Sequence, residues 1–399
     1  MMCGYLLARA GIDVWVLEKH GDFLRDFRGD TVHPSTLRIL DELGLLEAFL
    51  KRPYQKVTEL TAEFGKDAFK VADFARLPPP ADFIALMPQW DFLDFLCEEA
   101  RKFPAFHIAM DAQVTELLSR RGRIAGVRVK TPDGTGDLLA RLVIGADGRH
   151  STVRAKARLK VRELGAPFDV LWLRLPVEPD DPKHPVFRFV AGSLFVMLYR
   201  GDYWQCAMII PKGGFAEIKA QGLSGFQARL RTAAGFARDR AETIKSFDDV
   251  KLLTVAIDRL ERWARRGLLC IGDAAHAMSP VGGVGINLAI QDAVAAANIL
   301  SPVLAKKTPS LRRLRRVQRR RAFPARIVQR AQVFVQDNIL APTMRNKTTP
   351  RPPLLLQLVD RWGWLRQWPA RLIGIGVRAE HVRSPAMRRD PRPGDSAPT

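Results

Sequence analysis

The sequence lacks several features that mark whole classes of protein. No apolar run approaches the ~18–20 uninterrupted residues of a membrane span, and the N-terminus has neither the basic start nor the cleavage site of a signal peptide. The cysteines are few and scattered, without C-x-x-C or metal-ligand spacing: Cys3, Cys97, Cys206 and Cys270. We therefore expect a cytoplasmic protein with reduced structural thiols and no metal site.

Acidic residues are also scarce relative to basic ones. The 399 residues include 63 Lys and Arg but only 42 Asp and Glu, which gives a net charge of +21. Most of the excess lies between Lys306 and Arg392. An anionic membrane surface or nucleic acid would be attracted to such a region. The alternative is a solvated, Arg-rich helical surface, which we favour; we expect no nucleic-acid partner and leave peripheral membrane contact and a homodimer open.

The stretch from 268 to 292 is the most informative part of the chain. Its apolar start ends in Gly272-Asp273, which predicts a buried strand that presents a carboxylate at the carboxyl edge of a sheet. A turn rich in Pro and Gly follows from Pro280 to Gly285, and a helical pattern begins at Ile286. Glycines let backbone approach a ligand closely, and a helix N-terminus offers free N–H groups and a positive dipole end. Such a site suits the electron-rich edge of a flavin ring, with Asp273 accepting from a ribityl hydroxyl.

A second motif supports this interpretation. The string G-A-D-G-R-x-S-x-V-R, from Gly145 to Arg154, follows a strand pattern and opens a helix. Together with G-D-A-A-H-x3-P-x2-G-x-G-x-N, from Gly272 to Asn287, it resembles the FAD-dependent aromatic hydroxylases of the para-hydroxybenzoate hydroxylase type, the group A flavoprotein monooxygenases. The resemblance covers nearly the whole chain.

The resemblance implies a set of site residues. Arg28 and Pro280 take catalytic positions near the flavin and the substrate, and His276 is a structural member of its motif rather than a general base. A solvent-facing Arg28 and a helix-capping Gln89 are the alternatives at those two positions. The cofactor-binding residues that the resemblance implies are Glu18, Lys19, Arg28, Gln89, Asp147, Gly148, Arg149, Gly272, Asp273, Pro280, Gly283, Gly285, Ile286 and Asn287.

One part of a dinucleotide-binding unit is missing from the sequence. Residues 4–11 read as the end of a helix closed by Gly11, and residues 12–18 read as a buried strand that ends in Glu18, the ribose-binding acid. The preceding strand and its G-x-G-x-x-G loop are absent. We expect Met1 to be an internal methionine of a gene that encodes about 10–15 more residues. The alternative is a shortened protein that binds FAD weakly or not at all.

The predicted fold is α/β (α+β): a Rossmann-like FAD-binding domain that lacks its first strand and Gly-rich loop, a β-sheet substrate domain and C-terminal helices. The FAD-binding domain takes residues 1–164, with inserted strands that include a hairpin at 57–74, and residues 263–303. The substrate domain takes residues 165–262. A basic helical region follows at 304–385, with Pro324 as a break or restart, and residues 386–399 form a disordered tail.

The function implied by the resemblance is that of an FAD-dependent monooxygenase. NAD(P)H reduces the flavin, O2 forms a C4a-hydroperoxide, and one oxygen atom passes to an aromatic or similar small organic substrate. Two alternatives stay open: an FAD-dependent reductase or dehydrogenase of a polyprenyl-type lipid, and a truncated, flavin-free protein.

Overall fold

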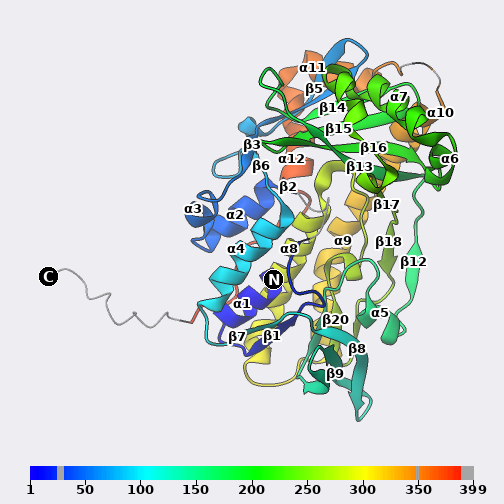
Figure 1. The fold of residues 1–399 in the computed structure, drawn as a ribbon. Helices are drawn as coiled ribbons and strands as arrows, with labels where there is room; N and C mark the ends of the chain where they lie inside the picture. Colours follow the sequence, from blue (N-terminus) through cyan, green and yellow to red (C-terminus); the bar gives the residue numbers. More distant parts are fainter. Residues whose placement is uncertain (25–30, 347, 349, 388–399) are drawn as a thin grey trace.

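The computed structural model describes residues 1–24, 31–346, 348 and 350–387. Two long helices, α8 (Gly285–Leu304) and α9 (Leu311–Val335), run side by side through the molecule. Figure 1 shows the large sheet at one end of these helices and the strands β8 (Gln113–Arg120) and β9 (Arg123–Thr131) at the other. The mixed α/β class predicted from the sequence is confirmed.

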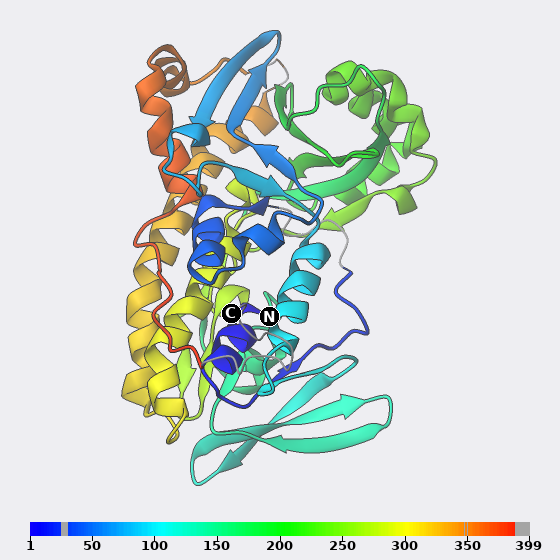
Figure 2. The same ribbon diagram turned by 90° about the vertical axis from the view of Figure 1, so that its left-hand side faces the viewer.

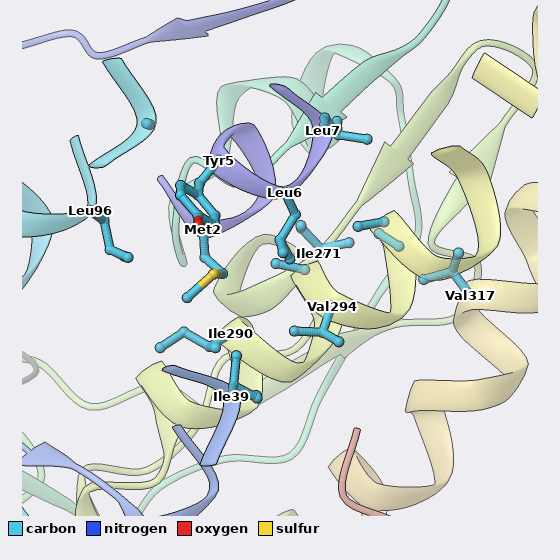
Figure 3. Close-up of a cluster of buried hydrophobic side chains, with 14 of the residues drawn as sticks. Met2, Tyr5, Leu6, Leu7, Ile39, Leu96, Ile271, Ile290, Val294 and Val317 are labelled. Atoms are coloured by element: carbon cyan, nitrogen blue, oxygen red, sulfur yellow. The ribbon is translucent and has the colours of Figure 1, made fainter. Parts of the chain in front are cut away.

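The N-terminal unit consists of helix α1 (Met2–Arg9) followed by strand β1 (Val14–Leu17). Helix α1 buries Tyr5, Leu6 and Leu7 in the core that it shares with α8 (Figure 3). The chain turns into β1 through Gly11, whose φ of 72° is one that glycine adopts without strain. Strand β1 pairs in parallel with β7 (Phe106–Ala109).

A second small parallel pair carries both motif loops. Strand β11 (Val143–Gly145) lies parallel to β20 (Leu268–Cys270), which also pairs with β19 (Ala264–Arg265). Because the two strands are parallel, the loops that follow them leave from the same edge. Among the residues described, β1 pairs only with β7, and β11 only with β20.

The remaining elements of this half are short. The helices are α2 (Pro34–Glu42), α3 (Leu46–Phe49), α4 (Gln89–Arg101) and α5 (Thr152–Lys156). The strands are β2 (Thr31–Val32), β3 (Gln55–Val57), β6 (Ile84–Leu86), β8 (Gln113–Arg120), β9 (Arg123–Thr131), β10 (Gly134–Leu139), β12 (Val161–Glu163) and β18 (Asp258–Leu260). All four cysteines are free thiols, and burial raises the pKa of Cys270 to about 12.

A seven-stranded sheet forms the other half, in the order β17-β13-β16-β15-β14-β4-β5. Its strands are β4 (Glu59–Phe64), β5 (Asp67–Asp73), β13 (Phe168–Pro176), β14 (Val186–Val190), β15 (Ser193–Tyr199), β16 (Tyr203–Pro211) and β17 (Lys251–Leu253). Helices α6 (Phe215–Ala220) and α7 (Gly222–Ala234) and the 3₁₀ segment η2 (Gly235–Thr243) follow β16. Residues of α7 and η2 bury the outer face of the sheet.

The hairpin predicted at 57–74 is present, but it extends the sheet beyond the predicted range of 165–262. Strand β4 pairs in parallel with β14, and Phe64 stacks on Phe189 with ring centroids 4.4 Å apart. Alternating patterns predict each strand separately, whereas this pairing joins residues more than one hundred positions apart. The sequence pattern carries no signal for it.

The prediction of a break at Pro324 is wrong, because α9 continues through it. A proline removes only one helical hydrogen bond, the one to the carbonyl four residues earlier. Pro324 is buried, and its neighbours Ala325 and Val328 pack on Leu288 of α8, which holds the helix across the gap. The segment Val281–Leu304, which includes α8, is long and apolar enough to cross a membrane, but 61% of its apolar window is buried in the protein.

The C-terminal part consists of the π-helical turn η6 (Gln336–Leu340), α10 (Ala341–Arg345), α11 (Leu354–Arg361), η7 (Gly363–Arg366) and α12 (Gln367–Gly374). Figure 2 shows the orange and red helices of this part along one side of the molecule, against the blue β4–β5 hairpin. Residues 388–399, in the predicted tail, lie outside the described residues.

A buried ion pair holds the outer face of the large sheet. Asp181 accepts hydrogen bonds from Arg240 and from the indole N–H of Trp204, at 2.8 Å in the second case. Burial opposes the charge on Asp181, but these donors outweigh it and lower the pKa of the carboxyl to about 2. Because the ordinary pKa is near 4, the carboxylate contributes stability above about pH 4 and loses it as the pH falls toward 2.

We expect Asp181→Asn to lower the free energy of unfolding by roughly 3 kcal/mol at neutral pH, since it removes the charge that pairs with buried Arg240. The deficit should shrink to about half near pH 3, where the unfolded state already binds the proton. Urea unfolding followed by tryptophan fluorescence at both pH values measures this. The exposed neighbour Asp180→Asn serves as the control, and an equal loss in both variants would contradict the assignment.

Candidate active site

One large cavity of about 2460 Å³ lies between the motif loops and the inner face of the large sheet. All but two of the fourteen residues predicted to bind the cofactor line it. Arg28, the predicted catalytic arginine, lies outside the described residues. Asn287 lies behind the cavity wall and is buried. The structure thus brings together residues from Glu18 to Ile286, which the sequence connects only through their motifs.

The N-terminus of α8 faces this cavity without a side-chain cap. The first N–H to find a helical acceptor is that of Leu288, which donates to the carbonyl of Val284 at 3.0 Å. The N–H groups of Gly285 and Ile286 therefore have no partner within the helix. Gly282 and Gly283, with φ values of 80° and 62°, form the turn in front of the helix. This arrangement suits an electron-rich group.

The side chain of Asn287 holds the glycine turn in place. Its amide nitrogen donates to the carbonyls of Thr31 and Gly283, at 3.1 and 3.3 Å. Its amide oxygen accepts from the backbone N–H of His33 at 2.9 Å and from the hydroxyl of Thr36 at 2.7 Å. All four hydrogen-bonding positions of the side chain are thus used within the protein. The side chain fixes the loop, and a ligand can meet only the backbone of this residue.

His33 extends the same contacts to the C-terminal helices. Burial lowers its pKa to about 4, although the carbonyl of Ile373 partly opposes the shift, so the ring is neutral at pH 7. Its Nδ1 donates to that carbonyl at 2.9 Å. Residue 373 belongs to α12, and His33 also lines the cavity. Helix α12 is therefore connected, through His33 and Asn287, to the glycine turn that faces the cavity.

Three carboxylates lie around the cavity at the ends of strands. Glu18 follows β1, Asp147 follows β11, and Asp273 follows β20. Asp147 also stabilises the start of α5, because it accepts from the hydroxyl of Ser151, the N-cap residue, and from the N–H of Val153 at 3.0 Å. Each acid lies where the sequence predicts it, at a carboxyl edge.

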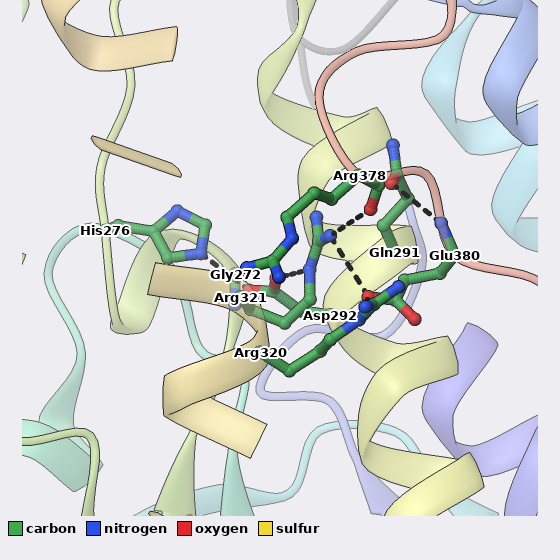
Figure 4. A network of polar contacts seen from close by, with 8 residues as sticks. All are labelled: Gly272, His276, Gln291, Asp292, Arg320, Arg321, Arg378 and Glu380. Carbon is green, nitrogen blue, oxygen red and sulfur yellow. Dashed lines mark hydrogen bonds and ion pairs between the residues drawn. The ribbon is translucent and has the colours of Figure 1, made fainter. Parts of the chain in front are cut away.

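A buried polar network holds the loop that carries Asp273 (Figure 4). Asp292 of α8 accepts from the N–H of Gly272 at 3.0 Å, from His276 Nε2 at 2.6 Å and from Arg321 Nε at 2.9 Å. Burial opposes the charge on Asp292, but His276 and Arg321 outweigh it and lower the pKa of the carboxyl. Arg321 also contacts Glu380 at 3.3 Å. His276 is thus structural in its contacts.

Two glutamines of α9 were not identified from the sequence. Gln332 accepts from the N–H of Ser279 at 3.1 Å and donates to the carbonyls of Ser279 and Val281, both at 2.9 Å. Gln329 donates to the carbonyls of Asp258 and Ala277, at 2.8 and 3.0 Å. Both side chains are buried. Their spacing of three on the apolar side of an Arg-rich helix was the available signal, since polar residues at core positions need partners.

The far end of the cavity is apolar. Its walls come from the inner face of the large sheet, from the end of α9 with η6, and from the C-terminal helices. Among the described residues that line it from these elements, none is Asp, Glu, Lys or Arg. The sheet contributes Val170, Trp172, Phe187, Phe189, Leu194, Val196, Ala207 and Ile209. The charged residues that line the cavity come from the motif loops and the strands beside them.

The residues present fit FAD. The uncapped α8 terminus, the glycine turn and the acids at three strand ends are the donor and acceptor types that an electron-rich ring and sugar hydroxyls require. The volume exceeds the ~300–1,000 Å³ of an ordinary ligand pocket, so a dinucleotide and a substrate can share it.

We expect Arg321→Met to lower the free energy of unfolding by about 3–5 kcal/mol, because it removes the arginine that pairs with the buried carboxylate of Asp292 at 2.9 Å. Arg320→Met is the matched control. Arg320 contacts Glu380 too, but its side chain is 41% exposed. Its replacement should therefore lower the free energy of unfolding by less than about 1 kcal/mol. Urea unfolding of both variants measures the difference. Similar losses of unfolding free energy would show that the buried ion pair contributes no more to stability than the exposed one.

Comparison with known proteins agrees with this geometry. The FAD binding domain family matches residues 1–331. The 6-methylpretetramide 4-monooxygenase of Streptomyces rimosus is 34% identical over 385 residues, which covers 95% of this chain and 90% of the relative. The rifampicin monooxygenase of Streptomyces venezuelae is 29% identical over 301 residues, which covers 71% of this chain but 58% of the relative.

Solved structures show the same fold. The p-nitrophenol 4-monooxygenase PnpA of Pseudomonas putida has a TM-score of 0.72 at 19% identity, with 92% of this chain and 93% of that chain covered. PqsL of Pseudomonas aeruginosa has a TM-score of 0.70 at 22% identity, with 86% and 94% covered. The fold, the cavity and the sequence relatives lead to one conclusion: the chain belongs to the FAD binding domain family and is an FAD-dependent aromatic monooxygenase of the para-hydroxybenzoate hydroxylase type.

Proposed function

We propose that this monooxygenase hydroxylates a large, uncharged, multi-ring aromatic substrate. The observation that carries the proposal is the apolar end of the 2460 Å³ cavity, where no charged side chain of the described elements reaches the wall. A charged substrate would lose its hydration there without gaining a partner. The relative from Streptomyces rimosus is named for 6-methylpretetramide, which is therefore the first compound to test.

We propose that the predicted residues hold FAD at the other end. When bound, FAD accepts electrons from NAD(P)H and activates O2. The N–H groups of Gly285 and Ile286 stabilise negative charge on the flavin ring, and Asp273 accepts from a hydroxyl of the ribityl chain. Glu18 accepts from the ribose. Gln89 and Arg149 bind the diphosphate, and Pro280 packs between the flavin and the substrate. These roles fit the positions of the residues around one cavity.

One partner proposal concerns the basic C-terminal region. We propose that it makes peripheral contact with a membrane, while the homodimer stays a prediction from the sequence. Support for membrane contact comes from charge, because Lys and Arg are far more frequent than Asp and Glu in this region and Arg351, Arg361 and Arg371 are exposed.

We expect Asp273→Ala to weaken FAD binding by roughly tenfold or more, since a hydroxyl of the cofactor loses its acceptor. Asp137→Ala, on the exposed β10 strand, is the control and should leave the dissociation constant unchanged. Quenching of flavin fluorescence during a titration measures both. Equal affinities for Asp273→Ala and the unaltered protein would remove Asp273 from the site.

We expect uncharged multi-ring phenols, including 6-methylpretetramide, to stimulate NAD(P)H oxidation with matching O2 uptake. Their kcat/KM should exceed that of 4-hydroxybenzoate by roughly a hundredfold, since a carboxylate has no partner at the apolar end. An oxygen electrode and product analysis measure this. A preference for the small carboxylate would overturn the proposed substrate class, and turnover without O2 uptake would indicate a reductase.

A further inference from the structure

The C-terminal helices expose an unusual number of large apolar side chains. Two ridges with a spacing of four residues lie along them: Leu354 and Leu358 on α11 with Trp362 directly after it, and Trp364 on η7 with Trp368 and Leu372 on α12. The exposed fractions of these six side chains range from 42% to 77%. Within α11 and within α12, this spacing places Leu354 with Leu358, and Trp368 with Leu372, on one face of each helix. Six exposed large apolar side chains within one short segment indicate an interaction site rather than scattered surface residues.

The same segment is basic. Arg351, Arg361 and Arg371 are exposed, and none of the three has a carboxylate partner among the described residues. The one acid between positions 351 and 371, Asp360, is engaged by Arg366 at 3.2 Å and by the N–H of Lys70 at 2.9 Å. A second copy of this chain would bring a like-charged surface. An anionic surface with an apolar layer beneath matches both the arginines and the tryptophans.

These helices are also a wall of the cavity. Leu356 and Val359 of α11, Leu365 of η7, and Trp368 and Leu372 of α12 line it. Trp368 is 64% exposed and Leu372 is 42% exposed, so both face the solvent as well as the cavity. They form the rim between the apolar end of the cavity and the exposed ridges. A ligand that crosses this rim moves from one apolar surface to another.

We propose that the ridges on α11, η7 and α12 dock on an anionic lipid bilayer and that the Trp368–Leu372 rim admits apolar substrate from the bilayer into the cavity. The tryptophans and leucines enter the boundary between headgroups and acyl chains, and the arginines pair with anionic headgroups. The inference rests on the proposed function, since the rim gives access to a cavity proposed to bind an uncharged multi-ring substrate. The docking surface is thus the two ridges, the partner is the bilayer, and the substrate enters past Trp368 and Leu372.

The test is co-sedimentation of the full-length chain with vesicles of phosphatidylcholine mixed with phosphatidylglycerol and with vesicles of phosphatidylcholine alone. We expect binding to the mixed vesicles and at least roughly tenfold weaker binding to the neutral ones. The double variant Trp364→Ala/Trp368→Ala should lose roughly tenfold or more in partition coefficient. Arg371→Gln should lose about fivefold.

Leu252→Ala, which truncates a leucine that is 44% exposed on β17, is the matched control and should bind as the unaltered protein does. Absence of binding to mixed vesicles, or equal binding by the tryptophan variant and the control, would overturn the proposal. So would a concentration-dependent dimer that the tryptophan variant abolishes without any vesicle binding. Circular dichroism of each variant excludes unfolding as the cause.

Vesicle binding needs neither flavin nor turnover, so its failure is separate from failure of the proposed function. A chain that binds vesicles but does not hydroxylate multi-ring phenols would support the docking surface and contradict the proposed substrate class. A chain that hydroxylates these phenols but does not bind vesicles would support the substrate class and contradict the docking surface.

Discussion

The structure depends on one buried carboxylate, that of Asp292. It accepts hydrogen bonds from Gly272 and His276 of the loop that carries Asp273 and from Arg321 of α9, so this loop and α9 meet at one charge on α8. A buried charge is costly unless its partners are held rigidly; Asp292 lies on α8, and its partners are held by α9 and by the loop after β20. Through Glu380 the same network reaches the end of the described chain. The geometry of the cofactor loop is therefore set by contacts outside the cavity.

The cavity has a polar end at the motif loops and an apolar end at the large sheet. Acids and uncapped N–H groups gather where parallel strands and a helix terminate, because those ends expose polar backbone. The large sheet instead presents alternating apolar side chains, which exclude water from the far end. A cofactor that generates a reactive oxygen species needs both surroundings, one to bind it and one to protect the chemistry from water. The C-terminal helices close the apolar end and lie against the β4–β5 hairpin.

Sequence patterns predicted the motif-bearing parts well because local rules govern them. Strand β20, the glycine turn and α8 follow from an apolar run, a Pro/Gly cluster and a helical pattern. The β4–β14 pairing could not be predicted, since it is a long-range contact between strands with equivalent patterns. The role of Asn287 was also out of reach: its motif position implied cofactor binding, whereas its side chain is occupied by Thr31, His33, Thr36 and Gly283. The prediction of a helix break at Pro324 failed because packing of α9 on α8 outweighs the tendency of proline to end a helix.

The central claim is that one cavity holds FAD at its polar end and an uncharged multi-ring substrate at its apolar end. The most direct test is the visible absorbance spectrum of the 399-residue protein, purified with FAD, desalted, and then titrated with 6-methylpretetramide. The account predicts a retained flavin band that shifts saturably as the compound binds beside the ring. A colourless protein, or a flavin band that the compound leaves unchanged at saturation, would contradict it.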